Sequence, residues 1–339
     1  MSERLTRVSS PAGIEEDLSA LWRDAARGAP IARALMSNLV VYRDCPAADA
    51  VNLSAPIEDV PIDEVIERHP SRLIRLHHGG RPDPGAPVGA TISIVSFGAG
   101  GARFGVEEIA VRSTCATASL PSIVRRLALG DIPTSIWWTE DLSRSALVDA
   151  LVAMGRQLLY DSRKWADPRR GFLALAPLLA NPHSPDLADL NWRRLTPMCQ
   201  ALTHAVAADP AIGSGQSAPP AVQVRHRRDE RARAWLLAGW LSSRLSAARA
   251  PEMPVTVAEE DAGAETVAVS IDGGAVTAVM NGERVLVQYR GGIAPFSIGV
   301  PRETEAEAVA AELRNLTHDR GLRDALTALA TRLTSSESF

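Results

Sequence analysis

Two helix–strand units follow one another in residues 120–160, which read LPSIVRRLALGDIPTSIWWTEDLSRSALVDALVAMGRQLLY. Apolar residues at helical spacing predict helices over 120–129 and 142–154, each closed by a glycine. Two short runs rich in β-branched and aromatic residues, 132–138 and 158–160, predict strands. A helix–strand alternation that repeats every 25 residues or so is typical of βαβ crossovers, which build parallel sheets. This stretch therefore predicts an α/β fold.

Upstream of this stretch, three more apolar runs have the composition of strands. They cover residues 73–76, 91–97 and 106–111. A glycine cluster at 98–101 separates the last two, with almost nothing else between them, so these two are expected to form an antiparallel hairpin. The first part of the chain is thus predicted to hold a mixed, mostly parallel sheet with flanking helices.

A change of composition at residues 208–220, ADPAIGSGQSAPP, divides the chain into two differently patterned halves. After it come four short alternating runs joined by glycine turns, which predict an antiparallel meander. A last helix is predicted near residues 303–333, with a break near Gly321 as the alternative. The second half is therefore expected to be a smaller α+β domain. The predicted units are an N-terminal amphipathic helix (1–30), an α/β domain (31–207), a linker (208–221) and the α+β domain (222–339).

Composition excludes several classes of protein. The chain has 339 residues and a net charge of −4, which disfavours nucleic acid as the main partner. Lys164 is the only lysine and follows Arg163, so the phosphate-binding loop that ends in Gly-Lys is absent. No stretch reaches the length of a membrane span, the N-terminus lacks an apolar signal region, and three widely spaced cysteines fit a reducing compartment. We therefore expect a cytoplasmic protein that does not bind a membrane.

Motifs for cofactors, metals and catalysis are also missing. The glycine cluster before Gly105 has Arg103 where the dinucleotide fingerprint needs glycine, and a strand follows it instead of a helix. The seven histidines form no H-x-H or H-E-x-x-H motif, and no G-x-S-x-G elbow occurs. Cys115 precedes a predicted helix, where its thiol could be activated, but burial as a small apolar residue is the favoured interpretation. We expect no catalytic residue, no cofactor and no metal.

Two predicted strands end in side chains that are suited to binding. Ligands and partners of open α/β sheets meet the carboxyl ends of the strands, and tryptophan is enriched in binding hot spots. The alternative is structural, since alternation would place the two tryptophans on opposite faces and the polar residues after the second strand could cap a helix. In the first interpretation Trp138 is an interface anchor, whose loss weakens binding with little effect on stability. The candidate partner-binding residues are Trp137, Trp138, Glu140, Asp161, Ser162 and Arg163.

Five segments, taken in order, resemble one protein family. They are HPSRLIRL (69–76), IPTSIWW (132–138), LLYDSRKWADP (158–168), DLNWRRLTP (189–197) and LLAGWLSSRL (236–245). Together they resemble the OpcA family, the glucose-6-phosphate dehydrogenase assembly proteins of cyanobacteria and actinobacteria. The resemblance continues into the last predicted helix with AAELRNLTHDRGLRDAL.

The resemblance implies a non-enzymatic protein of the oxidative pentose phosphate pathway. Such a protein would bind glucose-6-phosphate dehydrogenase, its expected partner, and act as an activator that promotes the active oligomer. The alternative from another class is an enzyme or a sensor of sugar phosphate or nucleotide, which would use the strand-end site and arginines such as Arg125, Arg126 and Arg163.

Overall fold

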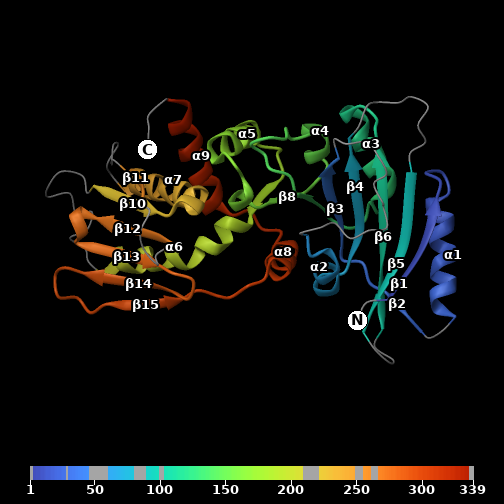
Figure 1. The fold of residues 1–339 in the computed structure, drawn as a ribbon, viewed down its shortest axis with the longest axis horizontal. Helices are drawn as coiled ribbons and strands as arrows, with labels where there is room; N and C mark the ends of the chain where they lie inside the picture. The colour runs from blue at the N-terminus through green and yellow to red at the C-terminus, as the bar shows by residue number, and fades with distance from the viewer. Residues whose placement is uncertain are drawn as a thin grey trace.

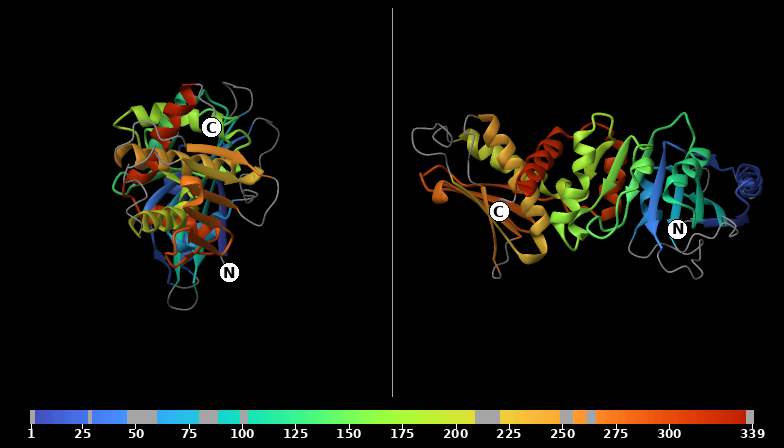
Figure 2. Two further views of the ribbon diagram at one scale, coloured as in Figure 1. Left: turned by 90° about the vertical axis from the view of Figure 1, so that its left-hand side faces the viewer. Right: turned by 90° about the horizontal axis from the view of Figure 1, so that it is seen from above.

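The computed structural model describes residues 3–27, 30–45, 60–79, 89–98, 103–208, 221–248, 255–260 and 266–335. Within these residues the chain forms a nine-stranded and a six-stranded sheet. The two sheets lie one after the other along the longest axis of an elongated molecule (Figures 1 and 2).

The first sheet is mixed and mostly parallel, as predicted. Its strands from β6 to β9 are all parallel, whereas β5 runs antiparallel to both β6 and β1. In spatial order the strands are β1 (Glu3–Ser9), β5 (Gly89–Phe97), β6 (Phe104–Ser113), β4 (Ser71–His78), β3 (Ser37–Asp44), β7 (Thr134–Trp138), β8 (Gln157–Tyr160) and β9 (Asp186–Asp189), and β2 (Ala32–Arg33) pairs with β6.

The six parallel strands have the order of a doubly wound, dinucleotide-binding fold. Numbered along the chain from β3, their spatial order is 3-2-1-4-5-6. The order reverses between β3 and β7, which is the point where folds of this kind bind their ligands. The expected hairpin is confirmed, because β5 and β6 pair up to Phe97 and Phe104, while its glycine tip lies outside the described residues.

Helices cover both faces of the first sheet. Four helices pack on one face: α1 (Ile14–Ala26), α3 (Leu120–Leu127), α4 (Asp149–Val152) and α5 (Pro168–Ala180). The other face is covered by α2 (Ile62–Arg68) and, from far along the chain, α8 (Glu305–Arg314), which lies beside α2 in Figure 1. The C-terminal part of the chain therefore returns to the first sheet, a difference from the prediction that 222–339 forms one separate unit.

Buried ion pairs tie β4 to β6 inside the first sheet. Arg75 Nη1 lies 3.0 Å from Glu108 Oε1 on one face, and Arg72 Nη1 lies 3.3 Å from Glu107 Oε2 on the other. All four side chains are at most 3% exposed. The two arginines of the segment HPSRLIRL therefore have a structural role, since removing one partner of a buried pair leaves an uncompensated charge.

The second sheet contains an antiparallel meander in which three of the four predicted runs, β12, β13 and β14, pair as expected, and it continues into β15, a strand that was not predicted. Its strands are β11 (Val255–Glu259), β10 (Val222–His226), β12 (Val267–Ile271), β13 (Val276–Met280), β14 (Arg284–Tyr289) and β15 (Phe296–Gly299). β11 was expected in the meander but pairs parallel to β10. The order of these strands places the turn between β13 and β14 next to the chain that leaves β15.

Three long helices connect the two sheets: α6 (Leu190–Ala208), α7 (Arg231–Ala248) and α9 (Arg320–Thr334). α6 follows β9 without a break, and α9 packs against both α7 and α5. Most of the expected linker, residues 209–220, lies outside the described residues. In the part of the chain that the structure covers, we find no helix with the length and apolar character needed to span a bilayer.

Candidate functional site: the switch point and an arginine-lined cavity

Aromatic side chains of the chain itself close the switch point between β3 and β7. Tyr42 at the end of β3 and Trp138 at the end of β7 stack with ring centroids 4.0 Å apart and planes 10° from parallel. The Tyr42 hydroxyl lies 3.3 Å from His78 Nδ1 at the end of β4. Thr139 Oγ1 donates a 2.8 Å hydrogen bond to the Tyr42 carbonyl oxygen, so the ends of three adjacent strands are joined by direct contacts.

The residues at this switch point do not fit a dinucleotide. A dinucleotide fold places the pyrophosphate on a glycine-rich turn that opens a helix directly after the first strand. Residues 45–61, which follow β3 here, contain no glycine. Moreover, the backbone N–H of Asp44 donates a 3.2 Å hydrogen bond to Glu140 Oε1, so carboxylates stand where the pyrophosphate would need positive partners.

Both candidate tryptophans are core residues. Trp137 is 2% exposed and packs on the face covered by α2 and α8, whereas Trp138 is 1% exposed and packs on the opposite face. This arrangement is the structural alternative considered for the sequence: the Trp138 indole is buried in this chain, and its role as an interface anchor stays a prediction. The physical reason is that β7 is a central strand, so both of its faces are covered by helices.

The other strand end forms a buried polar network. Asp161 directly follows β8, and its two carboxylate oxygens accept hydrogen bonds of 2.9 and 3.0 Å from Arg194 of α6. Ser162 is fully buried, and its backbone N–H donates to Asp189 Oδ1 at 3.1 Å. Asn191 Nδ2 donates to Ser162 Oγ at 3.1 Å. The segments LLYDSRKWADP and DLNWRRLTP, which suggested the family, meet in this network.

Asp189 is the most strongly perturbed carboxyl of this network. Burial raises its pKa to about 7, with a further contribution from the nearby negative charge of Asp161. Its Oδ1 also accepts a 2.8 Å hydrogen bond from the Asn191 backbone, at the start of α6. Asp189 therefore holds the junction between β9 and α6 with a pKa that lies near neutral pH.

The two strand ends touch but form separate networks. Asp141 Oδ2, after β7, accepts a 2.9 Å hydrogen bond from the Ala166 backbone N–H, after β8. Glu140 is 20% exposed and bonds toward β3, whereas Asp161 bonds toward α6. The partner-binding role of the six candidate residues stays a prediction. Among the six, Glu140 and Arg163 are the ones whose side chains a partner could contact, because they are partly exposed, Arg163 to 48%.

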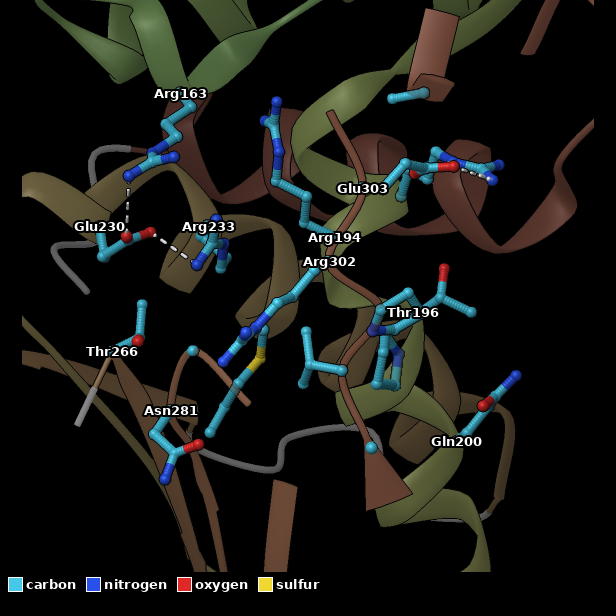
Figure 3. Close-up of a pocket in the computed structure, with 18 of the residues that line it drawn as sticks. Arg163, Arg194, Thr196, Gln200, Glu230, Arg233, Thr266, Asn281, Arg302 and Glu303 are labelled. Atoms are coloured by element: carbon cyan, nitrogen blue, oxygen red, sulfur yellow. Dashed lines mark hydrogen bonds and ion pairs between the residues drawn. The ribbon is translucent and has the colours of Figure 1, made fainter. Parts of the chain in front are cut away.

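The Arg163 side chain lines a cavity of about 590 Å³ between the two sheets (Figure 3). Its walls come from the turn after β8, from α6, from the start of α7, from the β13–β14 turn and from the connection between β15 and α8. The charged lining residues are Arg163, Arg193, Arg194, Arg227, Glu230, Arg233, Arg302 and Glu303.

A single buried carboxylate organises one wall of the cavity. Glu230 is 2% exposed and lies 3.0 Å from Arg233, 3.7 Å from Arg163 and 4.0 Å from Arg227. Arg233 is also buried, and its Nε donates a 3.2 Å hydrogen bond to Asn191 Oδ1. The wall is thus linked to the network around Asp189, which fixes several guanidinium groups around one space.

Sequence reasoning found only part of this cavity. Arg163 was named as a candidate, but Arg125 and Arg126 are exposed on α3 and do not line the cavity. The available signal was the pair Arg193-Arg194 in DLNWRRLTP, directly after a polar strand end. Arg227 belongs to a basic run that is typical of a solvated helix start, and its role depends on tertiary contacts.

Metal-ligating residues are scattered. In the described part of the chain no three histidine, cysteine, aspartate or glutamate side chains gather closely enough to hold a metal ion. The three cysteines are free and partly buried, and burial raises the pKa of the Cys199 thiol to about 12.

Comparisons with known proteins match both halves of the chain. Residues 62–177 match the family model described as glucose-6-phosphate dehydrogenase subunit N-terminal domain, and residues 185–326 match the one described as its C-terminal domain. No curated protein matches.

Two similar solved structures come from Magnetospirillum magnetotacticum and Sinorhizobium meliloti. The first is described as a putative oxidoreductase; it shares 13% sequence identity and a TM-score of 0.39, over 91% of this chain and 100% of that one. The second is described as a putative myo-inositol dehydrogenase; it shares 11% identity and a TM-score of 0.37, over 88% of this chain and 97% of that one. Their identities and TM-scores are too low to assign a function to this chain. The two family models, in contrast, match in order and span most of the chain. The chain therefore belongs to the OpcA family, whose two halves are named as domains of a glucose-6-phosphate dehydrogenase subunit.

Proposed function

We propose that this chain is a non-enzymatic assembly factor that binds glucose-6-phosphate dehydrogenase in the cytoplasm and promotes its active oligomer. The observation that carries this proposal is the match of both family halves, in order, along one chain. The matched residues include Trp138 on the β7 side of the switch point and the residues that line the arginine-rich cavity, whereas β3 with Tyr42 lies outside the matched ranges.

The closed switch point supports a role in binding rather than in hydride transfer. The fold has the strand order of a dinucleotide-binding sheet, yet the Tyr42–Trp138 stack joins the strands where that cofactor would cross. Burial and the neighbouring carboxylates Asp44 and Glu140 raise the pKa of Tyr42 well above its usual value, so its hydroxyl stays protonated. A strand end that is closed by the chain's own aromatic rings suits a scaffold.

The partner surface that we propose is the exposed edge after β7 and β8. Glu140 and Arg163 carry opposite charges on this edge and keep part of their side chains in solvent. Trp137, Trp138, Asp161 and Ser162 lie beneath it, where they hold the edge in place. Rim charges of this kind steer association and set its salt dependence more than they set affinity.

A titration of purified dehydrogenase from the same organism with this chain tests the proposal. We expect dehydrogenase activity to rise and saturate, and the chain alone to reduce neither NAD nor NADP in the presence of glucose 6-phosphate. The control is a mixture with heat-denatured chain. Unchanged activity of the dehydrogenase at every concentration would contradict the proposal, and turnover by the chain alone would favour the enzyme alternative.

A further inference from the structure

The lining of the cavity between the sheets carries an excess of positive charge. Its described residues include six arginines and two glutamates, so the lining carries four more positive than negative charges, and four carboxylates outside the lining balance them. The remaining carboxylates that pair with these arginines, Asp161, Asp229, Glu283 and Glu312, lie outside the lining. A guanidinium that is bound on one edge by such a carboxylate keeps other N–H donors to direct into the cavity.

Several of these guanidinium groups are close enough to repel one another. Burial lowers the pKa of Arg233 below its usual range, and the negative charge of Glu230 offsets part of this effect. The positive charges of Arg163 and Arg194 lower the pKa further. Arg227 Nε is buried without a hydrogen-bond partner among the described residues. In Figure 3 the side chains of Arg163, Arg194, Arg233 and Arg302 surround one space. An anion placed there would relieve this repulsion.

From this cavity we infer a binding site for a small phosphorylated, hydroxyl-rich metabolite, of the size and chemistry of a sugar phosphate. Phosphate oxygens match the fork of arginine donors, which is why arginine clusters recognise phosphate groups. A volume of about 590 Å³ lies within the range of small-molecule sites, about 300–1,000 Å³.

The uncharged lining residues favour a ligand whose other part is a sugar rather than a nucleobase. Thr196 and Gln200 of α6 and Asn281 of the β13–β14 turn also line the cavity, and with Glu303 they supply donors and acceptors for hydroxyl groups. The described lining residues include no aromatic side chain on which a base could stack. The apolar portion is aliphatic, with Met280, Val300 and two prolines.

The position of the cavity gives its ligand a structural effect. Arg163 follows a strand of the first sheet, whereas Asn281 and Arg302 belong to connections of the second sheet. A ligand held by both parts stabilises their arrangement, because any molecule that binds only the folded state raises its stability. The site goes beyond the proposed assembly function, since it needs no dehydrogenase.

Calorimetry and thermal melts on the isolated full-length chain test this inference. The probes are glucose 6-phosphate, glucose, inorganic phosphate and ATP. We expect glucose 6-phosphate to bind and raise the melting temperature, glucose to have no effect, and inorganic phosphate and ATP to bind more weakly. Arg302→Gln and Arg163→Gln should each weaken glucose 6-phosphate binding about tenfold or more, because each removes charged hydrogen bonds.

Arg27→Gln is the matched control for Arg302→Gln. The two side chains are 80% and 79% exposed, and Arg27 pairs with Asp24 at the end of α1, outside the cavity. No binding of glucose 6-phosphate, equal binding of inorganic phosphate or ATP, or equal weakening by Arg27→Gln would each overturn the inference. These experiments contain no dehydrogenase, so their failure leaves the assembly function standing, and a failed activation titration leaves this site standing.

Discussion

Burial gives Trp138, the last residue of IPTSIWW, a role in stability. Its indole is 1% exposed and stacks on Tyr42, so Trp138→Ala leaves a cavity in the centre of the first sheet. We expect the free energy of unfolding to fall by about 3–5 kcal/mol. Urea unfolding measures this loss, and any loss of dehydrogenase activation should follow the unfolded fraction.

Trp138→Phe is the control for this prediction. The indole Nε1 makes no hydrogen bond within the described residues, so phenylalanine keeps the stacked ring and leaves no partner of Nε1 unsatisfied. It should cost less than half of the loss caused by alanine. A melting temperature that hardly moves in Trp138→Ala, together with weaker activation, would instead restore Trp138 as an interface anchor.

Asp189 predicts a pH dependence of stability. Its pKa is about 7 in the folded chain against 3.8 for the ordinary side chain, so between these values the unfolded chain loses the proton and the folded chain keeps it. The contribution of Asp189 to the free energy of unfolding is therefore fully present below about pH 4. It is lost as the pH rises from 4 to 7, which lowers the free energy of unfolding by up to about 4 kcal/mol.

Asp189→Asn removes this cost while keeping an oxygen that can accept from the Ser162 and Asn191 backbones. We expect the variant to be more stable than the parent chain at pH 8 and to lose this advantage near pH 4. Denaturant unfolding at several pH values checks the difference. An advantage of the same size at every pH, or a less stable variant at pH 8, would show that Asp189 is not the titrating group.

At the scale of elements, Gly239 sets how closely α7 and α9 approach. A Cβ at this position would lie 2.4 Å from the backbone oxygen of Ala325 in α9, closer than such atoms can approach. Gly239→Ala should therefore destabilise by about 1–3 kcal/mol through overpacking, although alanine favours helices. Gly130→Ala, with no atom within 4 Å of the added carbon, is the control and should change stability by less than about 0.5 kcal/mol. A Gly239→Ala variant as stable as the control would contradict this packing.

Elements with their own breakers could be predicted from the sequence, and elements without them could not. The strands β7 and β8 have short apolar runs, and the helix α3 has apolar periodicity and a closing glycine, and all three occur where expected. The helix predicted over 142–154, which is also followed by a glycine, is reduced to α4 (Asp149–Val152). β9 was missed because its four residues, Asp186–Asp189, pass directly into α6 with no turn signal. The last helix divides into α8 and α9, where Asp319 accepts from the Leu322 backbone and starts the second helix.

For the whole molecule, the C-terminal helices connect the two sheets. α8 packs beside α2 on the first sheet and α9 lies between α5 and α7. Limited proteolysis within residues 209–220 should therefore give two bands under denaturing conditions but one species of unchanged size by native gel filtration. Fragments that separate without denaturant would show that these contacts do not hold the molecule together.

The sequence predicted little of the candidate cavity, because its walls come from segments that lie far apart in the chain. Its lining residues run from Arg163 to Ala308 and derive from both sheets. Local patterns identify a strand end such as Asp161–Arg163, but which arginines meet it depends on how α6 and the β15–α8 connection cross. The segment DLNWRRLTP contains Arg193 and Arg194 but was used only for the family resemblance. Arg227 lies in a basic run that was interpreted as a solvated helix start, and Arg302 had no local signal.

The assembly function is tested most directly by the size of the dehydrogenase in the presence of this chain. Light scattering coupled to gel filtration, with activity measured across the same fractions, reports mass and function together. We expect a heavier species that contains both proteins and holds most of the dehydrogenase activity, growing as the chain is titrated in. If the two proteins elute separately with their individual masses at concentrations well above those of the activity assay, the assembly function is contradicted.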